Sequence, residues 1–476
     1  MPDKMPNILF LMTDQMQNRV LDPGHVCKTP NLDKLMERGV RFQRAYTPNA
    51  ICSPARASLM TGLLPHNHGV LTVTHVVDDD QSMLRTEHPH WAQHLVDAGY
   101  QTGYYGKWHV ERTGKLEDFG WQRHNQDIWS GHQKRNQAEY SMEFVLDNPG
   151  YNPQRFYGVT NCPPEERGVG LVTQRAIDYL DDVMGGDAPW CCFASVIEPH
   201  DPFICGEEAF SLYDVDQIEV SPSLHDEMAD RPGIYRKAGR VWSHLTEAQH
   251  REAAACYFAS ITEIDQQFGK LIDKVMQGPD ADNTIIVFTT DHGEHLGAHG
   301  LYCKNFCADE EVYSIPLIMA GPGIAKGKVS RARVGLHDLC PTLMELTGCK
   351  PIENPDSRPF TDAAADPEAK DADYDIGFAE YHGGRMNVTQ RIVWQGDWKY
   401  VFNGFDFDEL YNLADDPYEM QNRAEEPAQQ DRVKEMCKIL WRTIRETGDH
   451  SVLNSHYPIL RVAPFGPKIL EEDKPG

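Results

Sequence analysis

The sequence is poor in positive charge. Its 476 residues include 45 lysines and arginines against 72 aspartates and glutamates, which gives a formal net charge of −27 at pH 7. A surface of this sign repels nucleic acids and long polyanions, so we expect no nucleic acid as a partner. A small anionic substrate is still compatible with this charge, provided that its pocket gathers positive side chains.

The sequence also lacks a long hydrophobic run. Residues 1–6 lead directly into a strand, without the apolar segment that a signal peptide or a membrane span requires. The 12 cysteines are scattered along the chain rather than regularly spaced, and a chain of this size needs no disulfides to fold. We therefore expect a cytoplasmic protein without a membrane partner.

No internal repeat is evident, and 40% hydrophobic with 25% charged residues is typical of a globular enzyme. A chain of this length exceeds one simple core, which predicts a large domain followed by a smaller one. Residues 350–375 are rich in proline, aspartate and alanine and are interpreted as a linker or wrapping loop. We accordingly predict a catalytic α/β domain over residues 1–375, and an α+β subdomain with a tail over residues 376–476.

Two apolar runs have the pattern of strands that are buried on both faces of a parallel sheet. They cover residues 7–12 and 284–290, and they lead into Asp14-Gln15 and Asp291-His292. The carboxyl ends of strands carry the functional site in open α/β sheets. Either pair alone is explained as loop capping, but the repeated pattern favours a site to which both strands contribute.

A short helix is predicted to begin at Pro54 and to end at Gly62, and Cys52 lies just before its first residue. Ser53 suits the N-cap, Pro54 suits the first helical position, and Gly62 is the usual left-handed terminator. Cys52 then faces the helix N-terminus, where unpaired N–H groups and the helix dipole favour an anion and lower the pKa of a thiol. This arrangement indicates a nucleophile directed at an anionic substrate, although a packed cysteine fits the same place.

Further elements follow from the periodicity of the chain. Strands are expected over 40–46 (an edge-like strand), 190–197 and 310–319, and helices over 30–38, 90–98, 246–278 and 337–346. Segments 111–167 and 204–243 are weakly periodic, which predicts long loops that shape substrate choice. Near the C-terminus, strands are predicted over 376–381, 390–394 and 398–403, followed by a helix over 429–446.

The run Cys52-Ser53-Pro54-Ala55-Arg56-Ala57-Ser58-Leu59-Met60-Thr61-Gly62 resembles the signature of the type I sulfatases. The resemblance covers nearly the whole chain, because it also includes Asp14, Gly106-Lys107-Trp108-His109, Pro199-His200-Asp201-Pro202-Phe203, Asp291-His292-Gly293, Lys304 and Glu409-Leu410-Tyr411. It implies the fold of the alkaline phosphatase superfamily: a large mixed, mostly parallel sheet flanked by helices, plus a smaller C-terminal α+β domain with a short antiparallel sheet. It also implies that a formylglycine-generating enzyme oxidises Cys52 to formylglycine.

On this template one divalent cation is bound by Asp14, Asp291 and the modified Cys52, with His292 and Gln15 completing the shell. A hard cation such as Ca²⁺ prefers oxygen ligands and is our first expectation. Many sulfatases carry Asp-Asp and Asp-Asn at these two places, whereas this chain has Asp-Gln and Asp-His. The imidazole makes Mn²⁺ or Zn²⁺ a second option, and the two pairs resemble those of choline sulfatases and phosphonate monoester hydrolases.

The resemblance also implies a role for each cationic side chain. The hydrated aldehyde at residue 52 attacks sulfur, Arg56 holds it in place, and Lys107 and Lys304 clamp the sulfate. His200 or Lys304 protonates the leaving oxygen, and His109 removes a proton from the intermediate to expel sulfate.

Two other interpretations are left open by the sequence. A phosphonate monoester or phosphodiester hydrolase would use the same residues, because the phosphoryl and sulfuryl centres have the same shape. A catalytically silent metal-binding protein is the alternative from another class, although such a protein has no need of the full set of cationic side chains. The substrate is expected to be a small sulfate ester, and the proline-rich tail after His450 is compatible with an arm exchanged in a homo-oligomer.

Overall fold

The computed structural model describes residues 4–304, 307–354, 356–384, 387–453 and 457–472. The first three residues and parts of the predicted tail therefore lie outside the described residues. Within these ranges, none of the helices combines the length and the apolar character that crossing a membrane requires. The 12 cysteines all lie inside the ranges, and each is a free thiol.

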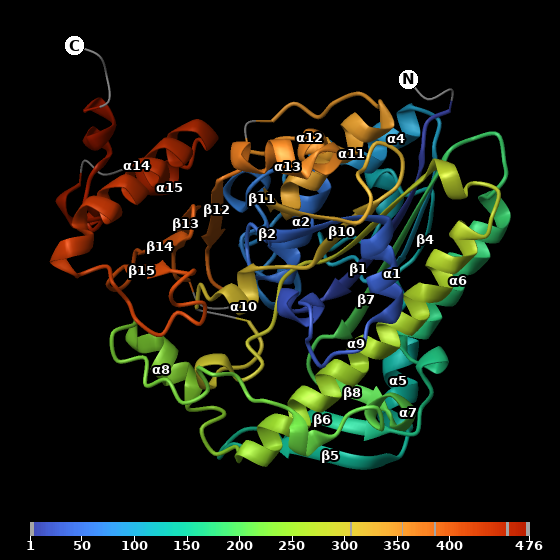
Figure 1. Cartoon of the computed structure of the whole chain (residues 1–476), viewed down its shortest axis with the longest axis horizontal. Coiled ribbons are helices and arrows are strands. Elements are labelled where there is room, and N and C mark those ends of the chain that lie inside the picture. The colour runs from blue at the N-terminus through green and yellow to red at the C-terminus, as the bar shows by residue number, and fades with distance from the viewer. Residues whose placement is uncertain (1–3, 305–306, 355, 385–386, 454–456, 473–476) are drawn as a thin grey trace.

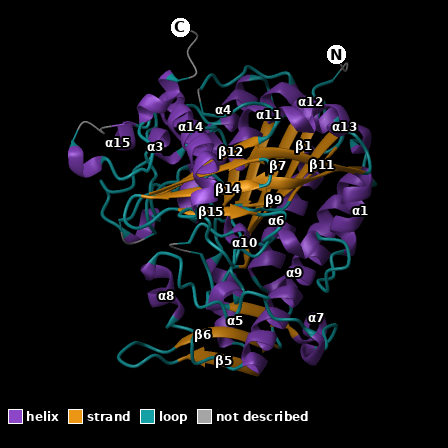
Figure 2. Cartoon of the chain, turned by 60° about the vertical axis from the view of Figure 1, so that its left-hand side comes forward, coloured by secondary structure: helices purple, strands orange, loops and turns teal. Residues whose placement is uncertain are grey.

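An eight-stranded mixed sheet forms the centre of the molecule (Figures 1 and 2). Its order is β11-β2-β10-β9-β1-β7-β3-β4, and β10 runs antiparallel to both of its neighbours while the other pairs are parallel. The strands are β1 (Asn7–Asp14), β2 (Gly39–Tyr46), β3 (Gln101–Gly106), β4 (Arg123–Asn125), β7 (Trp190–Pro199), β9 (Thr284–Thr290), β10 (Leu317–Ala320) and β11 (Lys328–Gly335). The predicted fold class is confirmed by this sheet and by the C-terminal sheet described below.

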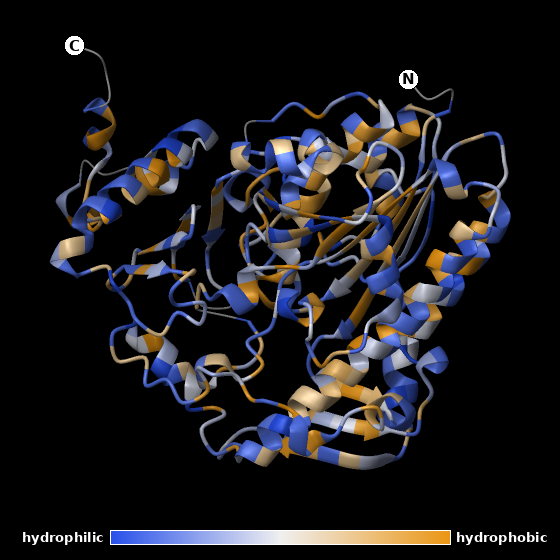
Figure 3. Ribbon diagram, in the orientation of Figure 1, coloured by the Kyte–Doolittle hydropathy of each residue, from blue (hydrophilic) through white to orange (hydrophobic). Residues whose placement is uncertain are grey.

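Strand β1 lies at the middle of the sheet because both of its faces are apolar. Leu9 and Leu11 point into one hydrophobic cluster, while Ile8, Phe10 and Met12 point into the other. Alternate residues of a strand face opposite sides of a sheet, so this unbroken apolar run fills two cores at once. Figure 3 shows the central strands as the most hydrophobic part of the chain.

Helices cover both faces of the central sheet. One face packs against α1 (Pro30–Arg38), α6 (Gly168–Val183) and α9 (Glu247–Met276). The other packs against α2 (Cys52–Thr61), α4 (Trp91–Asp97), α11 (Leu339–Thr347) and α12 (Thr361–Ala365). The long helix α9 begins at a capping box between Thr246 and Gln249, close to the start that was predicted for it.

Two smaller sheets complete the fold. A three-stranded sheet contains β5 (Tyr140–Leu146), β6 (Gln154–Thr160) and β8 (Phe203–Gly206). A four-stranded antiparallel sheet contains β12 (Ile376–Tyr381), β13 (Gln390–Gln395), β14 (Trp398–Asn403) and β15 (Glu409–Asn412), and α14 (Gln430–Thr447) packs against it. The shorter helices are α3 (Pro65–His68), α5 (Trp129–Gln137), α7 (Glu207–Phe210), α8 (Gly233–Gly239), α10 (Glu310–Tyr313), α13 (Pro367–Lys370) and α15 (His450–Leu453).

Several local predictions were wrong. Segment 111–167 is not a long loop, since it contains α5, β5 and β6, and segment 204–243 contains α7 and α8. The predicted strand 310–319 begins instead with the helical turn α10. The predicted linker 350–375 contains α12 and α13, and its residues Phe360 and Ala363 are fully buried in the core.

Two further corrections concern the position of an element rather than its type. Strand β2 is not at the edge of the sheet, because β11, which the sequence analysis missed, pairs with its outer side. Helix α2 begins at Cys52 rather than Pro54, with the extended residue Ile51 as its N-cap and no capping bond from Ser53. Gly62 does end this helix, with a φ of 72° in the left-handed region.

Candidate active site

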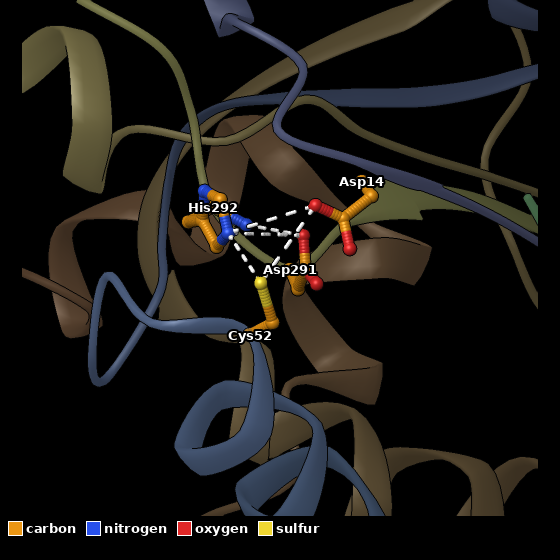
Figure 4. A group of neighbouring side chains, drawn as sticks. All are labelled: Asp14, Cys52, Asp291 and His292. Carbon is orange, nitrogen blue, oxygen red and sulfur yellow. Dashed lines mark hydrogen bonds and ion pairs between the residues drawn. The ribbon is translucent and has the colours of Figure 1, made fainter. Parts of the chain in front are cut away.

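The two strand-terminal acids meet beside the first turn of helix α2 (Figure 4). Strands β1 and β9 are parallel neighbours with Thr13 opposite Thr290, so Asp14 and Asp291 leave the sheet side by side. Cys52 Sγ lies 3.8 Å from Asp14 Oδ1 and 3.2 Å from His292 Nε2. His292 Nε2 in turn lies 3.8 Å from Asp14 Oδ1 and 3.7 Å from Asp291 Oδ1. These four side chains therefore converge on one buried point.

Arg56 holds the two aspartates from the next turn of α2. Its Nε donates to Asp291 Oδ2 at 2.7 Å, and its Nη2 donates to Asp14 Oδ2 at 3.1 Å. Its Nη1 donates to the backbone oxygen of Lys107 at 2.9 Å and to Ser195 Oγ at 2.8 Å. The guanidinium is 1% exposed, so it balances part of the negative charge that the carboxylates bring into the core.

Three further basic side chains lie around Asp14. Lys107 Nζ donates to Asp14 Oδ2, and His200 Nε2 lies 3.9 Å from Asp14 Oδ1. Lys304 Nζ lies 2.5 Å from His200 Nε2 and donates to Gln15 Oε1 at 2.7 Å. Positive side chains are therefore concentrated at this site in an otherwise acidic protein, as a pocket for a small anion requires.

Lys107 reaches the site because the backbone at the end of β3 lies very close to the backbone of β7. Gly106 has a φ of 99°, and a Cβ built on it would lie 1.9 Å from the backbone oxygen of Ser195 on β7. The Lys107 N–H then donates to the same oxygen at 2.8 Å. Only glycine fits at Gly106, and its side-chain-free backbone directs the following lysine towards Asp14.

His109 also lies at the site, with its backbone in the left-handed region at a φ of 57°. Its Nε2 lies 2.6 Å from Nδ1 of His75, while its Nδ1 is buried and has no hydrogen-bond partner among the described residues. Burial and the charge of Lys107 lower the pKa of His109 to about 4, and a side-chain interaction with Cys52 opposes them, so His109 is a neighbour of residue 52.

The charges of the site act on the ionisation of its members. Burial by itself raises the pKa of the Cys52 thiol, but the positive charges of Lys107 and Lys304 outweigh burial and lower this pKa to well below its usual range. The pKa of Asp14 is lowered as well, because Lys107, His200 and Arg56 outweigh burial and the charge of Cys52. Burial and the neighbouring Asp14 raise the pKa of Asp291. An anionic side chain at residue 52 is therefore favoured here.

The donor set fits a divalent cation. His292 Nδ1 lies 2.9 Å from the backbone oxygen of Gly293 and must donate to it, which leaves the Nε2 lone pair directed at Cys52 and the carboxylates. Ligand atoms of Asp14, Cys52, Asp291 and His292 all lie within 4.8 Å of one another. Carboxylate and imidazole ligands of this kind suit Ca²⁺, Mn²⁺ or Zn²⁺.

Gln15 lies next to this set but is directed away from it. Its Nε2 donates to Asp201 Oδ1 at 3.0 Å and to Glu294 Oε2 at 2.5 Å, while its Oε1 accepts from Lys304. A carboxamide oxygen has two lone pairs and Lys304 uses one, so Gln15 as a metal ligand stays a prediction.

Sequence reasoning missed three side chains that support the site. Ser195 accepts from Arg56, Glu294 fixes the carboxamide of Gln15, and His75 contacts His109. Glu294 follows the Asp291-His292-Gly293 motif directly, which is a signal that was available. No sequence motif marks Ser195 or His75. The pairing of β3 with β7 brings Ser195 near Arg56, and the path of the loop that carries His75 brings it near His109.

The chain was compared with known protein families and structures. A family model described as "Sulfatase" matches residues 6–349, and one described as "N-sulphoglucosamine sulphohydrolase, C-terminal" matches residues 297–446. A choline-sulfatase of Rhizobium meliloti is 30% identical over 446 residues, which cover 89% of this chain and 83% of that protein. An arylsulfatase of Clostridium perfringens is 26% identical over 488 residues, which cover 95% of this chain and 98% of that protein.

The fold is shared with solved structures as well. The phosphonate monoester hydrolase of Agrobacterium radiobacter superimposes with a TM-score of 0.78 at 23% identity, covering 93% of this chain and 96% of that one. Sequence identity at this level shows a common fold alone.

Proposed function

The chain belongs to the sulfatase family, a family of sulfuric ester hydrolases, and from this premise we propose that it cleaves a sulfate monoester through formylglycine formed from Cys52. The observation that carries the proposal is the convergence of Cys52, Asp14, Asp291 and His292 on one buried point next to Lys107 and Lys304. Maturation then requires a formylglycine-generating enzyme as a partner.

A divalent cation bound by Asp14, Asp291, His292 and residue 52, with Gln15 as the further predicted ligand, would hold the nucleophile and withdraw charge from the ester oxygens. Ca²⁺ remains our first expectation, and Mn²⁺ or Zn²⁺ the second because of the imidazole. The buried and mutually close donors support a divalent metal, since two carboxylates, an imidazole nitrogen and the side chain of residue 52 face one point.

Side chains of this protein bind the sulfate, orient the nucleophile and transfer protons. Lys107 and Lys304 neutralise the sulfate oxygens while the hydrate oxygen of residue 52 attacks sulfur, and Arg56 keeps the nucleophile's neighbours in place. His200 or Lys304 gives a proton to the leaving alcohol, and their contact of 2.5 Å supports a shared role. His109 then accepts the proton of the second hydroxyl, which regenerates the aldehyde and releases sulfate.

The substrate that we propose is a small sulfated metabolite or an aryl or sugar sulfate. The relatives support this range, because their names include a choline-sulfatase, an arylsulfatase and an N-acetylglucosamine-6-O-sulfatase. The net charge of −27 disfavours long sulfated polymers for the same electrostatic reason that it disfavours nucleic acid.

The division of the chain also stays our proposal, with a catalytic unit over 1–375 and a subdomain over 376–476. The second hydrophobic unit supports it, because β13, β14, β15 and α14 bury a cluster of their own that includes Val393, Leu410 and Leu440.

Mass spectrometry and a comparison of substrates test the proposal together. Conversion of Cys52 to formylglycine lowers the intact mass by about 18 Da, and Cys52→Ala provides the unmodifiable control. Protein produced together with a formylglycine-generating enzyme should hydrolyse an aryl sulfate faster than the matching phosphonate monoester or phosphodiester. A strong preference for the phosphonate would replace our proposal by the related hydrolase. A modified protein that is inactive on all three would favour a silent metal-binding protein.

A further inference from the structure

His75 makes a short contact with His109 that no function above requires. His75 Nδ1 lies 2.6 Å from His109 Nε2, and the two rings are tilted with centroids 4.7 Å apart. The other nitrogen of His109, Nδ1, is buried and unpartnered among the described residues, on a ring that neighbours Cys52. His109 thus has one nitrogen in contact with His75 and a second, buried nitrogen that is open for a proton of the substrate intermediate.

The loop that carries His75 is anchored at the nucleophile. Thr74 donates its N–H to Ser53 Oγ at 3.3 Å, and Ser53 is the residue that follows Cys52 on α2. Further along, Arg112 Nη2 donates to the backbone oxygens of Val77 and Asp78, both at 3.0 Å. His75 is exposed to solvent, yet its backbone is held on both sides.

The contact suits the form of the His109 ring that a general base requires. Two ring nitrogens at 2.6 Å share a single proton, so one donates and the other accepts. A general base at residue 52 needs an unprotonated Nδ1 on His109, and the neutral ring then carries its proton on Nε2. That proton points at His75 Nδ1, which accepts it.

We propose that His75 is a positioning residue that holds His109 with its Nε2 proton on His75 and its Nδ1 lone pair on residue 52. The inference rests on the proposed function, because it concerns the release step of that reaction. In this step the free hydroxyl of the sulfated hydrate gives its proton to His109 Nδ1. The electron pair of that O–H bond forms the aldehyde C=O bond, and the carbon–oxygen bond to the sulfate breaks, so that sulfate leaves with its electron pair.

Two variants with opposite expectations test the role. His75→Phe keeps a ring of similar size but removes the accepting nitrogen, whereas His75→Asn removes the ring but keeps an acceptor at the position of Nδ1. Exposed His225 in the loop 221–229 provides the control, as His225→Phe. Rapid mixing of each modified protein with a chromogenic aryl sulfate measures the first release of alcohol and the steady turnover separately.

We expect His75→Phe to release one equivalent of alcohol per modified site at the wild-type rate and then to turn over about 10- to 100-fold more slowly. His75→Asn and His225→Phe should stay within a few-fold of the wild type. Unchanged turnover in His75→Phe overturns the inference, and so does slow turnover without the initial release, since the first step would then be affected. A modified wild-type protein that cleaves no aryl sulfate refutes the proposed function itself.

Discussion

Raising the pH from 6.5 towards 9 should weaken the attachment of helix α3 to the C-terminal sheet. His66 lies 8% exposed at this contact, with Nδ1 2.8 Å from Glu380 Oε2 and Nε2 3.1 Å from the backbone oxygen of Thr447. Both ring nitrogens face acceptors, so both carry protons and the ring is an imidazolium. Burial alone lowers the pKa of His66, but Glu380 and Asp449 raise it to about 9.

The size of the effect follows from this pKa. The folded value of about 9 against 6.5 in the unfolded chain corresponds to about 3 kcal/mol of stability. Because the folded pKa is the higher one, this contribution is complete below the unfolded value and is lost as the pH rises through the folded value.

Urea unfolding followed by tryptophan fluorescence, at pH values on both sides of this window, measures the loss. His66→Gln cannot become charged, so its free energy of unfolding should lie about 3 kcal/mol below that of the wild type at the acidic side and approach it at the alkaline side. Exposed His244, replaced as His244→Gln, is the control and should follow the wild type throughout. If the difference between wild type and His66→Gln is the same at both pH values, the imidazolium assignment is wrong.

Three further results are expected. Removal of metal by a chelator should abolish activity and lower the thermal midpoint, and a divalent cation at 100 times its Kd should restore about 2.7 kcal/mol; an unchanged midpoint in calorimetry argues against the metal. Lys107→Met should lower kcat by about 10²- to 10³-fold, whereas Lys115→Met, at an exposed position, should leave kcat unchanged. Equal kcat values for the two variants would show that Lys107 does not bind the sulfate. Gly106→Ala should lower the thermal midpoint far more than Gly99→Ala, because both have a positive φ but a Cβ on Gly99 meets nothing within 4 Å; equal midpoints would contradict this.

Local sequence patterns were sufficient to predict the helices and strands whose structure depends on a few neighbouring residues. The apolar runs of β1 and β9 require burial on both faces, so both were predictable as strands; β9 has its predicted bounds, and β1 extends two residues beyond them, to Asp14. Thr246 and Gly62 act on the backbone of their own turns, and they mark helix ends where expected. The acids Asp14 and Asp291 were placed correctly for the same reason, since Asp14 ends β1 and Asp291 directly follows β9.

Predictions failed where distant segments decide the structure. Strand β2 is internal because β11 pairs with it, and nothing within residues 39–46 encodes that neighbour. Strand β5 alternates between half-buried and exposed residues, and it forms by pairing with β6, which in turn pairs with β8. Such pairings depend on the whole chain rather than on local preference.

The sequence by itself determined the family, the central strands and most of the side chains that converge near Cys52, because these residues lie in motifs at fixed places along the chain. The tertiary structure decided how they are combined. It turned the carboxamide of Gln15 towards Lys304, placed His75 on His109 and joined His66 to Glu380. Each of these contacts joins residues that are 34 to 314 positions apart in the sequence, so each exists only after the sheet and its loops have closed.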